Sequence, residues 1–263
     1  MGVIADLHVH TTASDGRLTV PELPAAARQG GVDIVAVTDH DRLHPGLDAA
    51  VTTLDGVTVI RGIELQVETA TGRVDLLGYG VKETAALRAE LDRLQADRIE
   101  RARRMADRIE DRLDASIEVA FEPGVGRPHV ARAVDASPAD CDYAGAFERF
   151  IGDDGPCYVS RDVPRVDRGL DLLSEACAVV SLAHPLRYAD PDAALELATD
   201  IDAVERHYPY GRPVDETQLD EVIAAHDLLV TGGSDAHGRR LGRAGLTPAA
   251  YAPIASRLPD AQG

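Results

Sequence analysis

Residues 3–16 read VIADLHVHTTASDG, a short apolar run that ends in two histidines and passes into a polar loop. An apolar run of this length is typical of a buried strand. Similar runs occur at 33–37, 57–63, 73–77, 178–183, 202–205 and 228–231. Helical patterns lie among them at 20–29, 45–53, 85–113, 130–136, 144–150, 168–176, 193–199 and 215–225. Strands that alternate with helices predict an α/β fold with parallel strands and right-handed crossovers.

The chain is strongly acidic: its 263 residues include 45 Asp and Glu against 27 Lys and Arg, and the formal net charge is −18. This balance argues against a protein that binds duplex DNA through a broad basic face. No apolar run approaches the roughly 18 residues of a membrane-spanning helix, so we expect no membrane partner. The acidity has two explanations, ordinary codon use or adaptation to a salty cytoplasm, where salt screens the self-repulsion of the chain. The scarcity of lysine and of large aromatic residues favours the second, a halophilic protein.

The cysteines and the N-terminus indicate the compartment. Cys141, Cys157 and Cys177 are odd in number and contain no CxxC pair, which supports neither a disulfide framework nor a thiolate zinc site. The chain opens directly on the strand at 3–9, without the basic segment and apolar stretch of a secretion signal. Both observations predict a cytoplasmic protein with reduced thiols.

The alternation of strands and helices is interrupted between residues 84 and 167. This interval holds a long charged helix and two shorter helices, joined by turns rich in Gly and Pro. Charges of opposite sign at helical spacing predict that the long helix has a solvated face. We therefore expect one α/β barrel at 1–247 that contains a helical insertion at 84–167, followed by a loosely packed tail at 248–263.

Five of the nine histidines follow predicted strands. They are His8 and His10 at the end of the first strand, His40 at the end of the second, and His184 and His237 after the runs at 178–183 and 228–231. In a parallel α/β barrel the carboxyl ends of the strands meet at one face, where such barrels place their active sites. Side chains alternate along a strand, so two histidines separated by one residue point the same way and can chelate one ion.

Carboxylates recur at the same strand ends. They are Asp15, Asp39, Glu64, Asp75 and Asp235. Imidazoles and carboxylates without thiolates suit zinc, manganese or iron, and not magnesium alone or an iron–sulfur cluster. A set of this size can hold more than one ion, with a carboxylate such as Glu64 as a bridge. The residues therefore predict a polynuclear hydrolytic centre.

Five motifs carry a resemblance to a known family. In chain order they read DLHVHTTASDG, VTDHD, GIEL, LAHP and SDAH, and together they resemble the PHP (polymerase and histidinol phosphatase) family over about residues 3–245. The resemblance implies a distorted seven-stranded β/α (TIM-like) barrel that holds two or three divalent ions, Mn²⁺, Zn²⁺ or Fe²⁺, and acts as a metal-dependent phosphoesterase. The segments GRPHVARAV and FERFIGDDGPCYV are most similar to stand-alone members that cleave nucleoside 3′,5′-bisphosphates and short RNA from the 5′ end.

The resemblance also implies a ligand set, position by position. One metal would bind to His8, His10, Glu64 and Asp235. A second would share Glu64 and use His184, with Asp75 at the place where the family usually has histidine. A third would use Asp15, His40 and His237. Aspartate is a competent ligand, so the second site is expected to persist with an altered metal preference or weaker binding.

The expected mechanism is attack on phosphorus by a metal-activated water, with Glu64 as a bridge and with Asp39 or another nearby carboxylate orienting a histidine ligand. Arg127, His129 and Arg187 are the candidates for binding substrate phosphate, because guanidinium binds phosphate in a fork geometry. Arg206 and His207, at another strand end, are weaker candidates.

Several functions remain open at this point. The expected substrate is a phosphorylated small molecule, such as a nucleotide, or a short 5′-phosphorylated oligonucleotide. The alternatives are a small-metabolite phosphatase resembling histidinol phosphatase, a hydrolase of C–N bonds, and a non-catalytic metal-binding domain.

Overall fold

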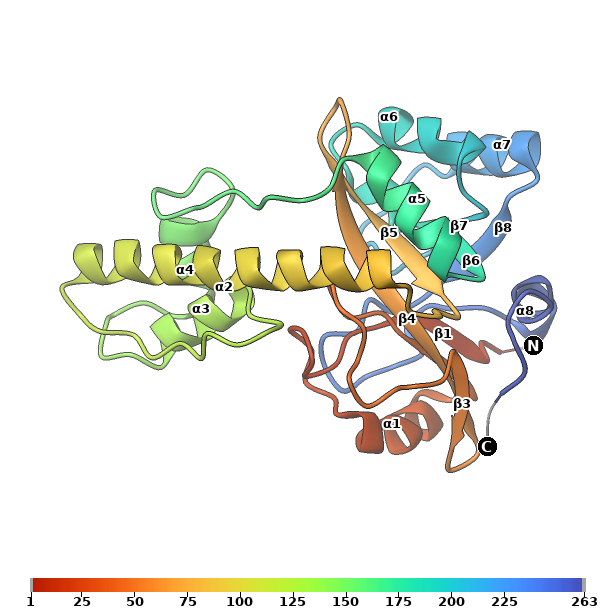
Figure 1. Cartoon of the computed structure of the whole chain (residues 1–263), viewed down its shortest axis with the longest axis horizontal. Helices are drawn as coiled ribbons and strands as arrows, with labels where there is room; N and C mark the ends of the chain where they lie inside the picture. The colour runs from red at the N-terminus through yellow and green to blue at the C-terminus, as the bar shows by residue number, and fades with distance from the viewer. Residues whose placement is uncertain (1, 262–263) are drawn as a thin grey trace. The chain divides into compact units, whose positions relative to one another are not determined.

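The computed structural model describes residues 2–261 and contains two compact units (Figure 1). The helical unit is Ala89–Asp162, which falls inside the interval predicted as an insertion. The sheet unit holds the described residues on either side of that segment. No helix in the described part of the chain is both long enough and apolar enough to cross a membrane.

One sheet organises the sheet unit and makes it a mixed α/β fold. Its strands are β1 (Ala5–Val9), β2 (Ile34–Val37), β3 (Val51–Leu54), β4 (Val57–Glu68), β5 (Arg73–Tyr79), β6 (Val179–Leu182), β7 (Ala203–His207) and β8 (Leu229–Gly232). Their order is β1-β2-β4-β5-β6-β7-β8, and β3 pairs with β4 off this path. Isolated bridges join Val9 to Ala236 and Ala5 to Leu246, so the chain beyond β8 returns to β1 and the seven-strand path curls.

The sheet is mixed, which corrects the expectation of parallel strands throughout. β5 runs antiparallel to both β4 and β6, whereas the pairs on either side of them are parallel. The reason is local: residues 69–72 form a tight turn in which the Thr69 N–H donates to the Gly72 carbonyl at 2.7 Å. A parallel connection would need a crossover of about a dozen residues or more. As a result, the beginning of β5 lies beside the end of β4, and Asp75 pairs with Gln66.

The helix predicted at 45–53 is wrong, because this stretch leads into a hairpin. β3 pairs antiparallel with β4 across the dipeptide Asp55-Gly56. Both turn residues have positive φ, 45° and 81°, as a two-residue hairpin turn of type I′ requires. The Asp-Gly pair beside β-branched residues was the sequence signal for this hairpin.

Helices accompany the sheet. They are α1 (Leu23–Gly30), α5 (Val166–Ala176), α6 (Pro191–Leu195), α7 (Thr217–His226) and α8 (Pro248–Ala255). Figure 1 shows α5 lying along β4 and β5, and it packs on β4 through Gly169, where a Cβ would overlap the Val67 side chain. The tail expected to be loosely packed contains α8, whose Ile254 is fully buried in one core with Ala5 and Val179. Residues 262–263 lie outside the described range.

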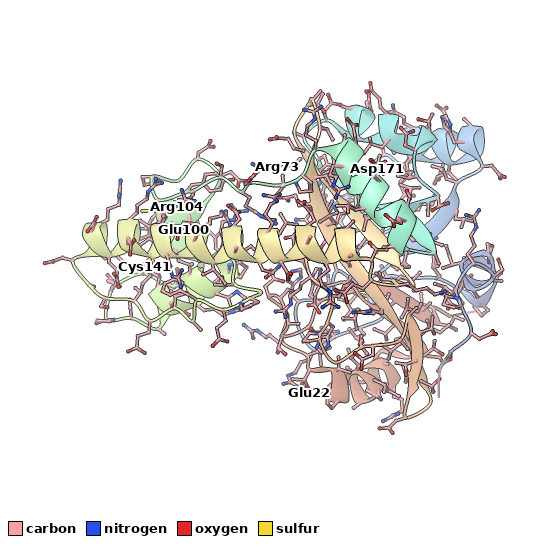
Figure 2. All side chains as sticks on the ribbon, viewed as in Figure 1. Glu22, Arg73, Glu100, Arg104, Cys141 and Asp171 are labelled. Atoms are coloured by element: carbon pink, nitrogen blue, oxygen red, sulfur yellow. The ribbon has the colours of Figure 1, made fainter. Side chains whose placement is uncertain are left out.

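The helical unit has a core of its own. Its helices are α2 (Ala85–Leu113), which starts in the sheet unit, α3 (Arg127–Asp135), α4 (Tyr143–Ala146) and a π-helical turn at Phe147–Ile151. Buried side chains of α2 such as Met105 and Ile109 belong to one cluster with Val130 and Val134 of α3. On the exposed side of α2, Glu100 and Arg104 lie one turn apart with 3.6 Å between Oε1 and Nε (Figure 2). The long helix is therefore solvated on one face only.

Candidate metal centre

Strand ends bring the predicted side chains together in the sheet unit. β1 carries His8, and His10 follows directly after it; both side chains are fully buried. His40 follows β2 and forms an isolated parallel bridge with Glu64 in β4. The remaining members come from the loop after β1, from β5, and from the turns after β6 and β8: Asp15, Asp75, His184, Asp235 and His237.

Glu64 is the centre of this group. Its Oε2 atom lies 3.3 Å from His8 Nε2, 3.2 Å from His10 Nε2 and 3.0 Å from His40 Nδ1. Its Oε1 atom lies 3.0 Å from His184 Nε2. The carboxylate is 1% exposed, so four imidazoles from three strand ends surround one buried carboxylate. This is the position that a bridging ligand requires.

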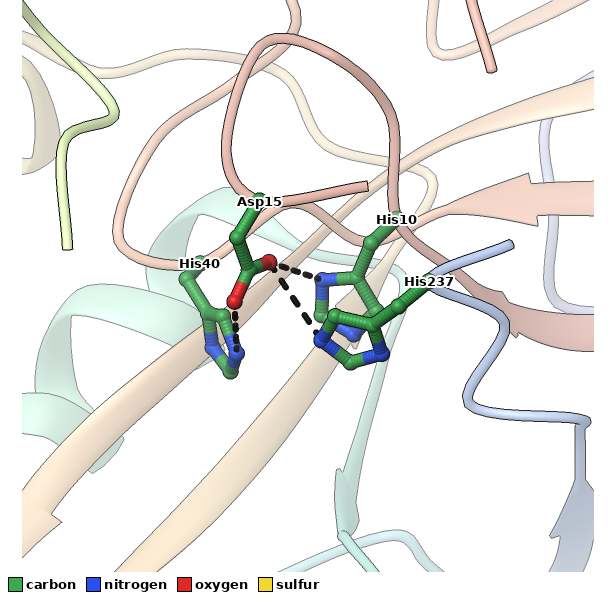
Figure 3. Close-up of side chains that lie close together, drawn as sticks. All are labelled: His10, Asp15, His40 and His237. Atoms are coloured by element: carbon green, nitrogen blue, oxygen red, sulfur yellow. Dashed lines mark ion pairs between the residues drawn. The ribbon is translucent and has the colours of Figure 1, made fainter. Parts of the chain in front are cut away.

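A second carboxylate, that of Asp15, lies among three histidines on the more solvent-exposed side of the centre. Figure 3 shows Asp15 facing the rings of His10, His40 and His237. Its oxygens lie 3.3 Å from His237 Nε2, 3.8 Å from His10 Nδ1 and 3.9 Å from His40 Nε2. The rings of His10 and His237 are stacked with 4.2 Å between their centroids. These four residues form one group of potential ligands within metal-binding distance of one another.

Two further groups share the β1 histidines. His8, His10 and Asp235 form one, and His8, Glu64 and His184 form the other. Asp235 Oδ1 lies 3.2 Å from His10 Nε2 and 3.6 Å from His8 Nε2. The predicted division of ligands differs in detail, because it assigned His10 to one metal only. In the structure His10 belongs to two groups and thus links them.

Several donor atoms of the centre are buried without a hydrogen-bond partner in the described part of the chain, as expected for atoms that bind divalent cations. Five of them are buried and make no hydrogen bond within the described chain: His8 Nε2, both ring nitrogens of His10, Glu64 Oε2 and His184 Nδ1. Buried polar atoms normally have a partner, because an unpaired one costs free energy. Four of these five atoms, all except His184 Nδ1, lie within 4 Å of another potential ligand of the centre, so bound cations would satisfy them.

Asp75 lies at the edge of the centre. Its Oδ2 atom is 3.8 Å from His184 Nε2, and its Oδ1 atom accepts a hydrogen bond from Gln66 Nε2 at 3.0 Å. Burial and the nearby charge of Glu64 raise the pKa of Asp75. It occupies the ligand end of the sheet because β5 is antiparallel and begins there. Its role as a ligand stays a prediction.

Replacing Asp75 tests that role. If it completes the site of His8, Glu64 and His184, Asp75→Ala will lower the metal content by about one ion per chain, whereas Asp75→His will preserve it. The measurement is elemental analysis of protein dialysed against a fixed concentration of Mn²⁺. Asp171→Ala, on the exposed face of α5, is the matched control (Figure 2). Equal metal content in all these forms would show that Asp75 is not a ligand.

The charges within the centre favour the ionised forms of His10 and Glu64. Burial alone would lower the pKa of His10, but the close contacts and negative charges of Asp235 and Glu64 raise it to about 10. Burial would raise the pKa of Glu64, yet the charges of His40 and His8 hold it well below its ordinary value. In the metal-free protein, charged His10 therefore stabilises the fold below pH 6.5, and this contribution disappears as the pH rises through about 10.

Metal binding is expected to release protons, because a histidine must be neutral to act as a ligand. Since the pKa of His10 is raised to about 10, the affinity for Mn²⁺ will increase with pH up to that value. The expected slope is about tenfold per pH unit for each proton displaced. Calorimetric titration in two buffers of different ionisation enthalpy counts these protons. An affinity independent of pH would contradict the protonated metal-free centre.

Asp39 acts in the structure on a loop and not on a histidine. Its carboxylate accepts hydrogen bonds from the Thr11 N–H at 2.8 Å, the Thr11 hydroxyl at 2.6 Å and the Ser14 hydroxyl at 2.5 Å. It therefore holds the loop that carries Asp15, which corrects its expected contact with a histidine ligand. A carboxylate outside the predicted ligand set, that of Glu205, does contact a histidine of the centre and lies 3.0 Å from His8 Nδ1. Sequence reasoning missed it, although it stands in VERHY at the end of a predicted strand.

The predicted phosphate-binding residues are distributed over both units. Arg187 follows β6, and its guanidinium donates to Asp235 Oδ2 at 3.1 Å and to the Tyr208 hydroxyl at 2.9 Å. Arg127 and His129 open α3 in the helical unit, where Arg127 donates to Asp153 Oδ1 at 2.7 Å.

The weaker candidates, Arg206 and His207, do not belong to the centre's ion pairs. Arg206 pairs with Asp220 and Glu216 on the side of α7. Burial and the charge of Arg206 lower the pKa of His207.

Comparisons with known proteins agree with this geometry. The model of the PHP domain matches residues 6–92. The phosphoribosyl 1,2-cyclic phosphate 1,2-diphosphodiesterase of Eggerthella lenta is 31% identical over 90% of this chain and 95% of its own. The 5′-3′ exoribonuclease Rnm of Escherichia coli is 28% identical over 89% and 85%. The 3′,5′-nucleoside bisphosphate phosphatase of Chromobacterium violaceum is 27% identical over 95% and 94%.

Solved structures have the same fold. An amidohydrolase from Chromobacterium violaceum, crystallised with sulfate and no metal, superposes with a TM-score of 0.76 at 23% identity, over 96% of each chain. A protein described as a metal-dependent phosphoesterase from Bifidobacterium adolescentis has a TM-score of 0.78 at 24% identity, over 97% of this chain and 96% of its own.

Proposed function

The chain belongs to the PHP domain family, and from this premise we propose that it hydrolyses phosphate esters of nucleotides or of short 5′-phosphorylated RNA as a metal-dependent phosphoesterase. We further propose that the curled sheet is a distorted TIM-like barrel holding two or three ions, Mn²⁺, Zn²⁺ or Fe²⁺. The observation that carries the proposal is the buried Glu64 carboxylate, surrounded by His8, His10, His40 and His184.

The residues of the centre would have different roles in hydrolysis: some bind the ions, one holds a loop, and one binds the substrate. Divalent ions bound here supply Lewis acidity toward phosphoryl oxygens and lower the pKa of coordinated water toward neutrality. Glu64 and the histidines around it hold those ions inside the sheet. Asp39 fixes the loop of Asp15 through Thr11 and Ser14, which keeps the more exposed ligands in place. Arg187, half-exposed beside Asp235, is suited to bind a phosphoryl oxygen of the substrate.

A cluster of arginines in the helical unit supports binding of a second phosphate. Arg98 and Arg101 are buried, with exposed fractions of 6% and 4%. Arg101 and Arg127 both face the Tyr158 ring, with 5.5 and 5.6 Å from guanidinium carbon to ring centroid. Burial and the positive charges of Arg161 and Arg127 lower the pKa of Arg101 to about 9. A binding site for an anion would relieve this repulsion.

Arg127 and His129 are the members we propose to contact the substrate. Arg127 pairs with Asp153, a carboxylate whose side chain is 80% exposed, so a phosphate can replace it at low cost. His129 accepts the Gly126 N–H through Nδ1 at 3.2 Å, which fixes the orientation of its ring.

The Arg127→Ala variant is expected to lose activity selectively. Substrates with two phosphates or a 5′-phosphorylated end should lose about ten- to hundredfold in kcat/KM, because a charge-assisted contact of about 1.5–3 kcal/mol is removed. A simple monoester such as p-nitrophenyl phosphate should lose little. Arg104→Ala is the control, because Arg104 pairs with Glu100 on the exposed side of α2. Equal losses on both kinds of substrate would remove the second-phosphate site.

A hydrolysis screen that measures the release of inorganic phosphate and of mononucleotides tests the function itself. The metal-loaded protein would be assayed with nucleoside 3′,5′-bisphosphates, 5′-phosphorylated oligonucleotides, phosphoribosyl cyclic phosphate and histidinol phosphate, with each candidate metal. We expect the first two classes to be the best substrates. Preference for histidinol phosphate would indicate a metabolite phosphatase. Metal binding without release from any substrate would indicate a non-catalytic domain.

A further inference from the structure

β7 contributes none of the nine predicted metal ligands, yet one carboxylate within this strand and one hydroxyl directly after it contact three of them. Glu205 lies within β7, and Tyr208 follows its last residue. We propose that β7 positions the metal centre: Glu205 holds His8 and His184, and Tyr208 holds Asp235. The inference rests on the proposed function, since it concerns the same centre, and it assigns positioning roles to two residues outside the ligand set.

Glu205 is a completely buried carboxylate whose hydrogen bonds all go to the centre. Its oxygens lie 3.0 and 3.2 Å from His8 Nδ1, and Oε2 accepts the backbone N–H of His184 at 2.8 Å. No lysine or arginine forms an ion pair with it within the described chain. A buried carboxylate is stable only when its charge is compensated. Here the compensation comes through His8, which is polarised between Glu205 and the centre.

The Glu205 contact decides which nitrogen of His8 can bind a cation. Because a carboxylate only accepts, His8 must donate through Nδ1. Nε2 then keeps its lone pair when the ring is neutral. That atom is the one directed at the centre, 3.3 Å from Glu64 Oε2. A carboxylate that fixes the tautomer of a histidine ligand in this way also increases its basicity.

The second Glu205 contact fixes the backbone of His184. This residue has φ of 30°, in the left-handed region that favours glycine. The hydrogen bond from its N–H to Glu205 Oε2 holds the turn after β6 in that conformation. The ring is thereby presented to the centre, with Nε2 3.0 Å from Glu64 Oε1. One carboxylate therefore orients histidines from two strand ends.

Tyr208 orients the third ligand that this strand contacts, Asp235. Its hydroxyl donates to Asp235 Oδ2 at 2.7 Å and accepts from Arg187 at 2.9 Å. The other oxygen, Oδ1, remains directed at His10 Nε2, 3.2 Å away. The Tyr208 ring also stands edge-on to His184, with centroids 5.4 Å apart. The hydroxyl thus selects which oxygen of Asp235 faces the centre.

Glu205→Gln separates positioning from packing, because the amide has the same shape. Both partners of Glu205 donate, so the amide nitrogen would face a donor. His8 can satisfy it only by accepting through Nδ1, which places the proton on Nε2 and blocks metal binding. We expect the affinity for Mn²⁺ to fall about 10- to 100-fold. Glu205→Asp, which restores the charge, should recover part of that loss.

The readouts are metal affinity by calorimetry and the visible spectrum of the Co²⁺-loaded protein, with folding checked by circular dichroism. Arg206→Ala is the matched control, since this neighbour on β7 pairs with Asp220 and Glu216. It should leave both readouts unchanged. Wild-type affinity and spectrum in Glu205→Gln would overturn the role of Glu205.

Tyr208→Phe keeps the inference testable if Glu205→Gln does not fold. Loss of the hydroxyl should alter the Co²⁺ spectrum and weaken Mn²⁺ binding by several-fold, about tenfold at most. An unchanged spectrum and affinity would overturn the positioning by β7. These outcomes differ from failure of the proposed function, in which the wild-type protein would bind no divalent ion or would bind it without hydrolysing any substrate.

Discussion

Glu64→Gln will leave a folded protein whose hydrolysis of phosphate esters falls by more than about a hundredfold. The amide keeps the size of the side chain but removes the negative charge that His8, His10 and His40 approach within 3.3 Å. A neutral amide is a poor bridging ligand, so the variant should also bind fewer ions. The measurements are phosphate release from a nucleoside 3′,5′-bisphosphate and metal content by elemental analysis.

Glu68→Gln is the matched control for this variant. Glu68 ends the same strand and is exposed, so its substitution should change neither activity nor metal content. Thermal unfolding of the metal-free proteins would verify that both variants fold. A Glu64→Gln protein that keeps more than about a tenth of the activity with unchanged metal content would contradict the bridging role.

Gly233→Ala is expected to disrupt the centre without changing any ligand. A Cβ at this position would overlap the backbone nitrogen and the Cβ of His8. β1 cannot yield easily there, since the His8 carbonyl accepts the Ala236 N–H at 3.2 Å and the His10 N–H donates to the Ala236 carbonyl at 3.1 Å. We expect a loss of about 1–3 kcal/mol in the free energy of unfolding, together with loss of metal binding.

Gly238→Ala offers a control in the same loop, because a Cβ there would have no atom within 4 Å. It should match the wild type in thermal unfolding and in metal content. If Gly233→Ala also matched the wild type, the close contact between β1 and the segment after β8 would not constrain the centre, and the positions of His8 and Asp235 would be set independently.

The sequence was most informative about the centre where chemistry and position coincide. Histidines and carboxylates directly after apolar runs predicted His8, His10, His40 and Glu64 as neighbours, because parallel strands in a curled sheet end on one side. The same reasoning grouped Asp235 with the histidines of the first strand, and in the structure its Oδ1 atom lies 3.2 Å from His10 Nε2. This prediction did not require knowledge of the order of the strands in the sheet or of their exact pairing.

The direction of the strands and the hydrogen-bond partners of buried carboxylates were harder to predict from the sequence. The reversal of β5 depends on a tight turn at 69–72, and apolar periodicity does not give strand direction. Asp39 and Glu205 illustrate the other difficulty. Both are strand-end carboxylates, yet one binds a loop and the other a histidine, and only the three-dimensional register distinguishes them. Local signals identify such groups without revealing their partners.

The antiparallel β4–β5 hairpin has a consequence for the order in which the chain assembles. Glu64 and Asp75 come together across a tight turn, a contact with a small entropic cost of loop closure. The contact of His8 with Glu205 spans 197 residues of sequence, and contacts of such large separation form more slowly than local ones. During synthesis the hairpin can form long before β7 leaves the ribosome. If Glu205 positions His8 as proposed, high-affinity metal loading would require nearly the whole chain to have been made.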